Sequence, residues 1–188
     1  MTTPNYLIVE VEEEYNNETK SENGFGFIVN TTIESVSNIN RIAKVVKAPE
    51  YVILEEGDEV VLHHNILRLR NSVGGNVIKS NFYIGDNQYY VPLTEVFMYR
   101  RDGEWHPLDP YCFVKPIRGV DREGFSYKNG YKGNLDHVGE IIVVNKSLEQ
   151  QGVKKGDIVA FSRDSEYEFN IDGDLLYKMS TKDILAIL

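Results

Sequence analysis

The sequence predicts an all-β protein that consists of two tandem, small and mostly antiparallel β-barrels. An apolar run, a Gly-Asp pair and a closing hairpin occur in this order twice, at residues 41–99 and again at residues 137–188. Helical periodicity is poor almost everywhere, and the 12 Tyr and 8 Phe favour β structure because flat side chains pack well on a pleated surface. An internal repeat defines the unit of folding, so we expect one domain at residues 1–103 and another at residues 104–188.

The first unit begins with a strand at residues 6–12, where β-branched residues partly alternate with polar ones. A long polar segment follows, and a compact apolar cluster at residues 25–29 interrupts it. A second strand is predicted at residues 41–49, where Pro49 limits it. Residues 51–70 indicate a strand, a turn at Glu56, Gly57 and Asp58, and another strand. Residues 71–80 are an insertion without a counterpart in the second unit, and residues 81–99 complete the unit with a hairpin.

A linker is predicted at residues 100–110, which concentrate charge, glycine and two prolines between apolar runs. Trp105 lies in this segment, where a lone Trp more often wedges two domains together than binds a ligand. The second unit then repeats the plan, with a strand at residues 111–117, a loop rich in Gly, Tyr and Lys at residues 118–136, a Gly-Asp turn and a closing hairpin. A helical pattern at residues 147–151 is long enough for one turn only.

The charge and hydropathy patterns exclude several classes of partner. The formal net charge is −9, and neither half of the chain carries the basic stripe that phosphate contacts need, so we expect no nucleic-acid partner. No apolar run approaches the length that spans a membrane. The first residues lack the basic region and long apolar run of a secretory signal. We therefore expect a soluble, cytoplasmic protein without a membrane partner.

The side chains best suited to metal binding or nucleophilic chemistry favour structural roles. The single cysteine, Cys112, excludes an intrachain disulfide and a Cys-based zinc site, and its apolar strand favours a buried thiol over a nucleophile. His63 and His64 are adjacent, so in a strand they would point to opposite faces and could not bind one metal. We expect both histidines to be structural.

The acidic and glycine-containing motifs also favour structural interpretations. Asp172, Gly173 and Asp174 lack the spacing and terminal Glu of a calcium loop, and a hairpin turn explains them better. Residues 12–14 are three consecutive glutamates, which are typical of a solvated run rather than a catalytic pair. No helix pattern follows the glycines near residue 25, so they are not a phosphate-binding fingerprint. We expect no cofactor, no metal and no enzymatic activity.

The order of motifs in the second unit resembles the C-terminal part of GroES-type co-chaperonins. In that family a Gly-Asp step opens a strand, a hairpin has an Asp-Gly turn, and the chain closes on a short apolar strand. The matching positions are Gly156, Asp157, Val159, Ile171, Asp172, Gly173, Asp183, Ile184, Leu185, Ala186 and Ile187. The first unit is similar but more diverged, through Tyr6, Ile8, Val9, Val45, Gly57, Asp58, Val60, Glu95 and Val96. The resemblance implies two GroES-like domains and covers nearly the whole chain.

The strongest candidate for a functional segment is the apolar cluster inside the long polar segment of the first unit. It consists of Gly24, Phe25, Gly26, Phe27, Ile28 and Val29. One interpretation is an extra core strand, because short apolar runs are ambiguous. The other is an exposed apolar segment that becomes ordered when it contacts a partner, because the glycines give the backbone freedom and such docking permits release.

The resemblance favours the second interpretation. GroES-type proteins have a mobile loop between their first two strands, with two glycines and an aliphatic tripeptide that docks on the apical domain of the chaperonin. Residues 18–30 are similar to this loop, although Phe25 separates glycines that are adjacent in the usual pattern. The tripeptide position is occupied by Phe27, Ile28 and Val29. The corresponding loop of the second unit, at residues 118–136, has no aliphatic tripeptide, so we do not expect it to bind in this way.

The resemblance implies a co-chaperonin, a non-enzymatic lid that binds the ATP-bound state of a GroEL-type double-ring chaperonin and encloses an unfolded client protein. It also implies a homo-oligomeric ring, and it leaves ATP hydrolysis to the chaperonin. The alternative is a structural or binding β module of the capsid or scaffold type without chaperonin contact. Zinc-dependent medium-chain dehydrogenases also contain a GroES-like domain, but the sequence lacks their dinucleotide-binding half and Cys/His ligands.

Overall fold

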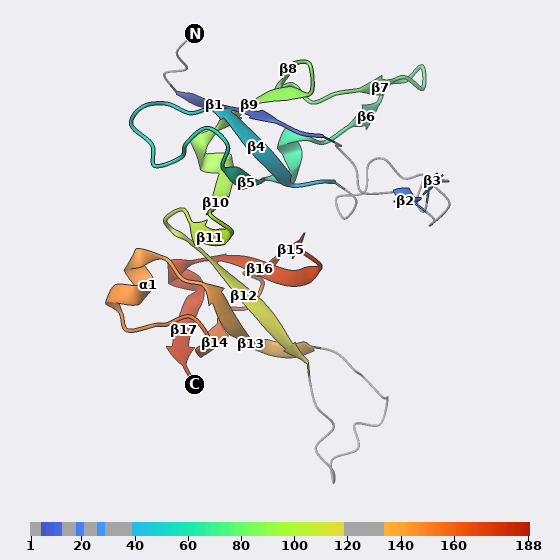
Figure 1. The fold of residues 1–188 in the computed structure, drawn as a ribbon. Helices are drawn as coiled ribbons and strands as arrows, with labels where there is room; N and C mark the ends of the chain where they lie inside the picture. The colour runs from blue at the N-terminus through green and yellow to red at the C-terminus, as the bar shows by residue number, and fades with distance from the viewer. Residues whose placement is uncertain (1–4, 13–17, 21–25, 29–38, 119–133) are drawn as a thin grey trace, which may run out of the picture. The chain divides into compact units, whose positions relative to one another are not determined.

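The computed structural model describes residues 5–12, 18–20, 26–28, 39–118 and 134–188. This part of the chain is mostly β, with two main antiparallel sheets of seven and six strands (Figure 1). The only α-helix among these residues is the short α1 (Lys146–Gln150), which lies where the sequence predicts a single turn. The prediction of an all-β protein is therefore confirmed. The chain divides into two compact units, Met1–Glu104 and Trp105–Leu188, which we call unit 1 and unit 2.

Unit 1 is built on the seven-stranded sheet, whose order is β11-β10-β5-β4-β1-β9-β8, and the boundary between the units falls inside the edge strand β11, after Glu104. Its strands are β1 (Tyr6–Glu10), β4 (Ile42–Lys47), β5 (Glu59–Leu62), β8 (Tyr83–Gly85), β9 (Gln88–Pro92), β10 (Val96–Arg101) and β11 (Glu104–Pro107). Two small sheets stand apart from it, one formed by β2 (Glu18–Lys20) and β3 (Gly26–Ile28), the other by β6 (Arg70–Asn71) and β7 (Val77–Ile78). Two short 3-10 helices, η2 (His64–Ile66) and η3 (Leu93–Glu95), connect strands.

Unit 2 is built on the six-stranded sheet, whose order is β15-β16-β12-β13-β14-β17. Its strands are β12 (Tyr111–Arg118), β13 (Asn134–Val143), β14 (Ile158–Phe161), β15 (Tyr167–Ile171), β16 (Asp174–Ser180) and β17 (Ile184–Ile187). The 3-10 helix η4 (Thr181–Asp183) joins the last two strands. The helix α1 begins after Asn145, whose side-chain oxygen accepts a hydrogen bond from the N–H of Leu148 at 2.9 Å.

The two sheets share one topology. From β10 to β8, the order in unit 1 is β10-β5-β4-β1-β9-β8, and the order in unit 2, taken from its last strand, is β17-β14-β13-β12-β16-β15. Each of these six strands thus has a counterpart at the same place in the chain order and in the sheet order. Both hairpins before the last strand turn through two residues of positive φ, Asp86 and Asn87 in unit 1 and Asp172 and Gly173 in unit 2. The sequence repeat is therefore a repeat of sheet topology.

The Gly-Asp pairs form the same turn in both units. Gly57 and Gly156 have φ values of 95° and 93°, in the left-handed region that favours glycine. The N–H of Gly57 donates to the carbonyl of Val45 at 2.9 Å, and the N–H of Gly156 donates to the carbonyl of Ile141 at 2.8 Å. These bonds tie each turn to the preceding long strand.

Among the described residues, strand pairing does not close either sheet into a complete barrel. Both sheets must nevertheless curl. In unit 1, β9 and β10 are four strand positions apart in the sheet, about 19 Å if the sheet were flat. Only η3 connects them, and its three residues together with the flanking bonds span at most about 14 Å. The same argument holds for β16 and β17 across η4. Each sheet therefore bends back on itself.

The core of unit 2 contains Cys112, as the sequence predicts. The Cys112 side chain is buried among Val114, Ile141, Phe161 and other apolar side chains. Burial raises the pKa of this thiol to about 12, so it carries no thiolate near neutral pH. Cys112 is therefore a packing residue. None of the described helices is long and apolar enough to span a membrane.

The segment predicted as a linker is instead a β-hairpin followed by a short connection. Residues 100–110 contain the end of β10, a turn at Asp102 and Gly103, and the whole of β11. Asp102 and Gly103 have φ values of 52° and 84°, the two left-handed conformations that a tight two-residue hairpin needs. The indole N–H of Trp105 donates to the Asp172 carboxylate at 3.0 Å, within unit 2. The boundary between the two units lies within this segment, after Glu104, so the segment does connect them, but through a hairpin strand.

Replacing Gly139 with alanine should destabilise unit 2, by about 1–3 kcal/mol. A Cβ at this position would lie 2.4 Å from Cγ1 of Val114 and 2.8 Å from the carbonyl oxygen of Lys115, closer than packed atoms approach. Denaturant unfolding measures the loss. Gly74→Ala is the matched control, because its Cβ would meet nothing closer than the Ser72 hydroxyl at 3.9 Å. Equal stability of the two variants would contradict the packing argument.

Candidate functional site

The predicted docking segment lies partly within the described residues. Gly24, Phe25 and Val29 lie outside them. Gly26, Phe27 and Ile28 form β3, which pairs antiparallel with β2 and with no other strand among the described residues. The register places Glu18 opposite Ile28 and Lys20 opposite Gly26. The segment is thus a strand, but one outside the seven-stranded sheet that carries the core of unit 1.

The position of β2 and β3 in the chain is that of an insertion. They lie between β1 and β4, which are neighbours in the seven-stranded sheet and pair directly through Val9 and Val45. The main sheet therefore has no gap that β3 would fill. In unit 2 the equivalent position, between β12 and β13, is the loop at residues 119–133, which lies outside the described residues. The prediction that this loop has no docking role remains a prediction.

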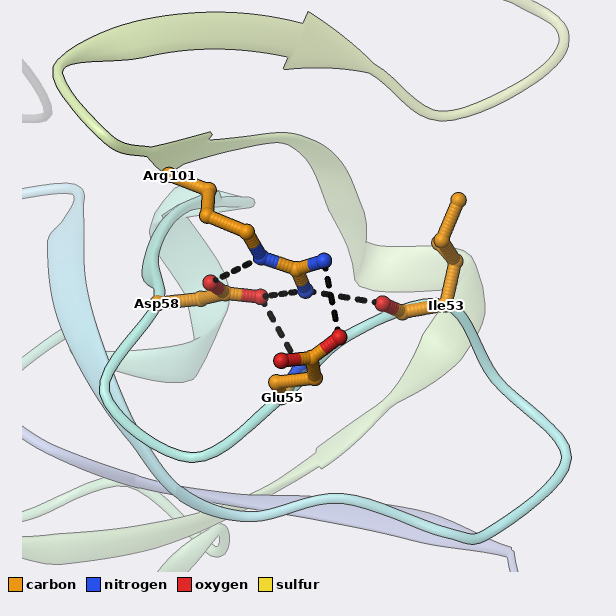
Figure 2. Close-up of polar contacts among 4 residues, drawn as sticks. All are labelled: Ile53, Glu55, Asp58 and Arg101. Carbon is orange, nitrogen blue, oxygen red and sulfur yellow. Dashed lines mark hydrogen bonds and ion pairs between the residues drawn. The ribbon is translucent and has the colours of Figure 1, made fainter.

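A second feature of unit 1 is an ion cluster around Arg101, which sequence reasoning missed. Figure 2 shows the Arg101 guanidinium between two carboxylates. Its Nε donates to Oδ1 of Asp58 at 2.9 Å and its Nη2 donates to Oδ2 at 2.7 Å. Nη2 also donates to the carbonyl of Ile53 at 2.9 Å, and Nη1 lies 2.9 Å from the Glu55 carboxylate. We call this cluster the Arg101 clamp.

The clamp joins the end of β10 to the loop between β4 and β5. The Asp58 side chain is only 4% exposed, and its Oδ2 also accepts the N–H of Glu55 at 2.8 Å. A bidentate pair of this kind is strong because both charged groups are held in a fixed geometry. The hydrogen bond to Asp58 raises the pKa of Arg101. Unit 2 has the same turn, because Asp157 accepts the N–H of Lys154 at 2.8 Å. Within its described residues, no arginine pairs with Asp157 as Arg101 does with Asp58.

The clamp lies in an open, polar cleft on unit 1. Its charged lining consists of Glu12, Lys44, Glu55, Glu56, Asp58, Glu59, Arg100, Arg101 and Asp102. Acidic groups therefore outnumber basic ones, and two of the three cations pair with acids of the cleft, Arg101 in the clamp and Arg100 with Glu59. Since six acidic groups face three basic ones, the cleft carries a net negative charge. Among the described residues, no group of three or more His, Cys, Asp or Glu side chains could hold a metal ion.

The two adjacent histidines are stacked, contrary to the prediction that they point to opposite faces. The ring centroids of His63 and His64 are 4.2 Å apart with an interplanar angle of 33°. The reason is that β5 ends at Leu62 and His64 begins η2, so strand alternation no longer applies. Nδ1 of His63 accepts the N–H of Asn65 at 3.3 Å and caps this 3-10 helix. The prediction of structural roles fits this capping position.

The hairpin interpretation of residues 172–174 is confirmed. Ile171 pairs with Asp174 across a turn at Asp172 and Gly173, which have φ values of 53° and 85°. The Asp174 carboxylate lies 2.7 Å from Nζ of Lys115, and Asp172 accepts the Trp105 indole N–H. Both carboxylates are thus engaged with side chains of their own unit.

Comparison with known proteins adds no identification. No model of a known protein family matches the chain, and a search of curated proteins finds no similar sequence.

Replacing Arg101 with alanine should lower the stability of unit 1, because it would leave the buried Asp58 carboxylate without its cation. Thermal or denaturant unfolding measures the loss. The matched control is Lys115→Ala, which removes an ion pair at the same short distance whose two side chains are 43% and 57% exposed. If both variants lose the same stability, the clamp is no more than a surface ion pair.

His64 should make the protein less stable as the pH falls. Its pKa is lowered from 6.5 to about 4, first by burial and then by the charges of His63, Arg41 and Arg68. Between these values the unfolded chain binds a proton at this residue and the folded chain does not, so the free energy of unfolding decreases as the pH drops through this window. His64→Gln should therefore narrow the difference in stability between pH 7 and pH 5. The free energy of unfolding of both proteins at both pH values tests this, and an unchanged difference would contradict it.

Proposed function

We propose that the protein is a co-chaperonin, a non-enzymatic lid that caps the ATP-bound end of a GroEL-type double-ring chaperonin and encloses an unfolded client protein. The observation that carries the proposal is the position of β3. This aromatic and aliphatic segment is inserted between β1 and β4 and pairs only with β2 among the described strands, outside the sheet that forms the core. A loop between the first two strands is where the GroES-type resemblance predicts the chaperonin-binding tripeptide.

The repeated topology supports two GroES-like barrels in each chain. Both units have the same strand order, the same Gly-Asp turn and the same short 3-10 connection before the last strand. The curl that this connection imposes favours a small barrel in each unit. Such a barrel buries a limited core, so association with other copies would add stability, and we propose a homo-oligomeric ring.

The acidic composition supports a chamber wall to which unfolded protein does not adhere. The formal net charge is −9, and the charged cleft of unit 1 that contains the Arg101 clamp is mainly acidic. A polar, charged wall offers an unfolded chain little apolar surface to bind. In this mechanism the lid performs no chemistry. The chaperonin binds and hydrolyses ATP, and the apolar contact must be weak enough to be broken in each cycle.

The docking segment is tested by Ile28→Asp, which should weaken binding to a GroEL-type chaperonin at least tenfold. Removing an aliphatic side chain from water contributes about 1.5–3 kcal/mol before ordering costs, and about 1.4 kcal/mol corresponds to tenfold. Co-sedimentation with the chaperonin, with and without ATP, measures binding. Phe125→Ser in the loop of unit 2 is the control, and it should have the smaller effect because no aliphatic tripeptide surrounds Phe125.

The unfolding midpoint of each variant separates the two interpretations of β3. A docking segment outside the core leaves the midpoint of Ile28→Asp close to that of the parent protein. A large loss of stability would mean that Ile28 is a core residue, and the proposal would lose its main support. Failure of the parent protein to bind the chaperonin with ATP would favour the alternative, a structural β module of the capsid or scaffold type.

A further inference from the structure

The β6–β7 hairpin of unit 1, residues 70–78, exposes aliphatic side chains that contribute nothing to the core. Val73, at its tip, is fully exposed, and Val77 and Ile78 are each about half exposed. The hairpin forms a sheet of its own, and unit 2 has no counterpart to it within its described residues. Three exposed aliphatic side chains on nine residues are more than the scattered apolar residues of an ordinary surface, so they indicate a contact with another molecule.

Hydrogen bonds hold this hairpin in one conformation. At the tip, the N–H of Ser72 donates to the carbonyl of Asn76 at 2.8 Å, and the N–H of Asn76 donates to the Ser72 hydroxyl at 3.0 Å. At the base, the hydroxyl of the buried Ser80 donates to the carbonyl of Ile66. The aliphatic side chains are thus presented on an ordered support, which reduces the entropy lost on binding.

The charge of the hairpin is opposite to that of the protein. Residues 60–85 contain no Asp or Glu, whereas the chain as a whole has a formal net charge of −9. Arg70 is an exposed residue of β6, and Lys79 follows β7 with its ammonium group 4.3 Å from the centre of the Tyr83 ring. The hairpin therefore has an apolar residue at its tip and positively charged residues at the end that joins the rest of unit 1.

The loop between β4 and β5, residues 48–58, has the complementary properties. Tyr51 and Ile53 expose 67% and 56% of their surface, and Glu55 and Glu56 are exposed beside them. The Arg101 clamp fixes this loop, because Arg101 binds the Ile53 carbonyl and the Glu55 carboxylate. The β4–β5 loop is thus an ordered surface that combines apolar side chains with negative charge.

We propose that the β6–β7 hairpin of one copy of this chain docks against the β4–β5 loop of a second copy. Val73 at the tip and Ile78 pack on Tyr51 and Ile53. Arg70 is opposite Ile78 in the register, on the same face of the hairpin, and lies against Glu56. In Figure 1 the hairpin and the loop project from opposite sides of unit 1, so one molecule does not bring its own two surfaces together. A second copy is the occupant that the charges favour, because the chain itself carries the matching acidic and apolar surface.

The contact is heterologous, since it joins two different surfaces of the same unit. Contacts of this kind generate a ring when the rotation between copies closes, and a filament when it does not. This inference does not rest on chaperonin binding. Because the charges at the contact are exposed, association should weaken as the salt concentration rises.

Two charge reversals and their mixture test the proposal. Sedimentation velocity of the whole chain across a concentration series should show concentration-dependent association. Arg70→Glu alone and Glu56→Arg alone should each weaken it severalfold, because each converts an exposed attraction into a repulsion. An equimolar mixture of the two variants should associate again, because each hairpin then meets a loop of opposite charge. The unfolding midpoints of both variants should stay near that of the parent protein, since neither residue belongs to the Arg101 clamp.

Asn76→Asp is the control, because it adds a negative charge to the hairpin without removing a positive one. It should weaken association less than Arg70→Glu does. A parent protein that stays monomeric at every concentration would overturn the proposal. Assembly that survives both reversals would assign the contact to another surface, such as the exposed edge strand β17, and would also overturn it. If only chaperonin binding responds to Arg70→Glu, the hairpin contacts the chaperonin and not a second copy.

Discussion

The carboxylate of Asp58 is the group on which the arrangement of unit 1 depends most directly. One of its oxygens closes the Gly-Asp turn by accepting the N–H of Glu55, as Asp157 does with Lys154 in unit 2. Both oxygens also bind Arg101, so the same buried carboxylate connects the turn to β10 and fixes the exposed β4–β5 loop. Both units thus share the hydrogen bond that closes the turn, and in unit 1 the same carboxylate also binds an arginine of β10.

The sequence predicts features that depend on local conformation and misses those that depend on long-range pairing. Gly57 and Asp172-Gly173 are recognisable because positive φ favours a few residue types, whatever surrounds them. The Arg101 clamp joins residues 43 apart, and no local signal shows that β10 lies beside β5. The stacking of His63 on His64 depends on where β5 ends, which is the least certain feature of a predicted strand.

The candidate site follows the same rule: the sequence shows which residues are apolar, but not with which strand they pair. An apolar cluster with glycines inside a polar segment is visible in the sequence, and it identifies Phe27 and Ile28 as unusual. A short apolar run cannot show by itself whether it joins the main sheet, because that depends on which strand it pairs with. The pairing of Lys20 with Gly26 supplies this information, since it places β3 in a separate two-stranded sheet.

The two units differ mainly in the segments between their shared strands. The β2–β3 insertion, the clamped β4–β5 loop and the β6–β7 hairpin all belong to unit 1, while unit 2 has α1 between β13 and β14, the place of the β4–β5 loop. Connecting segments can change without disturbing the ladders that bury the core, which is why binding residues concentrate on them. In a duplicated fold, one copy can therefore acquire contact surfaces while the other keeps the shared sheet. In unit 1, the exposed apolar side chains of Tyr51, Ile53 and Val73 lie on these connecting segments.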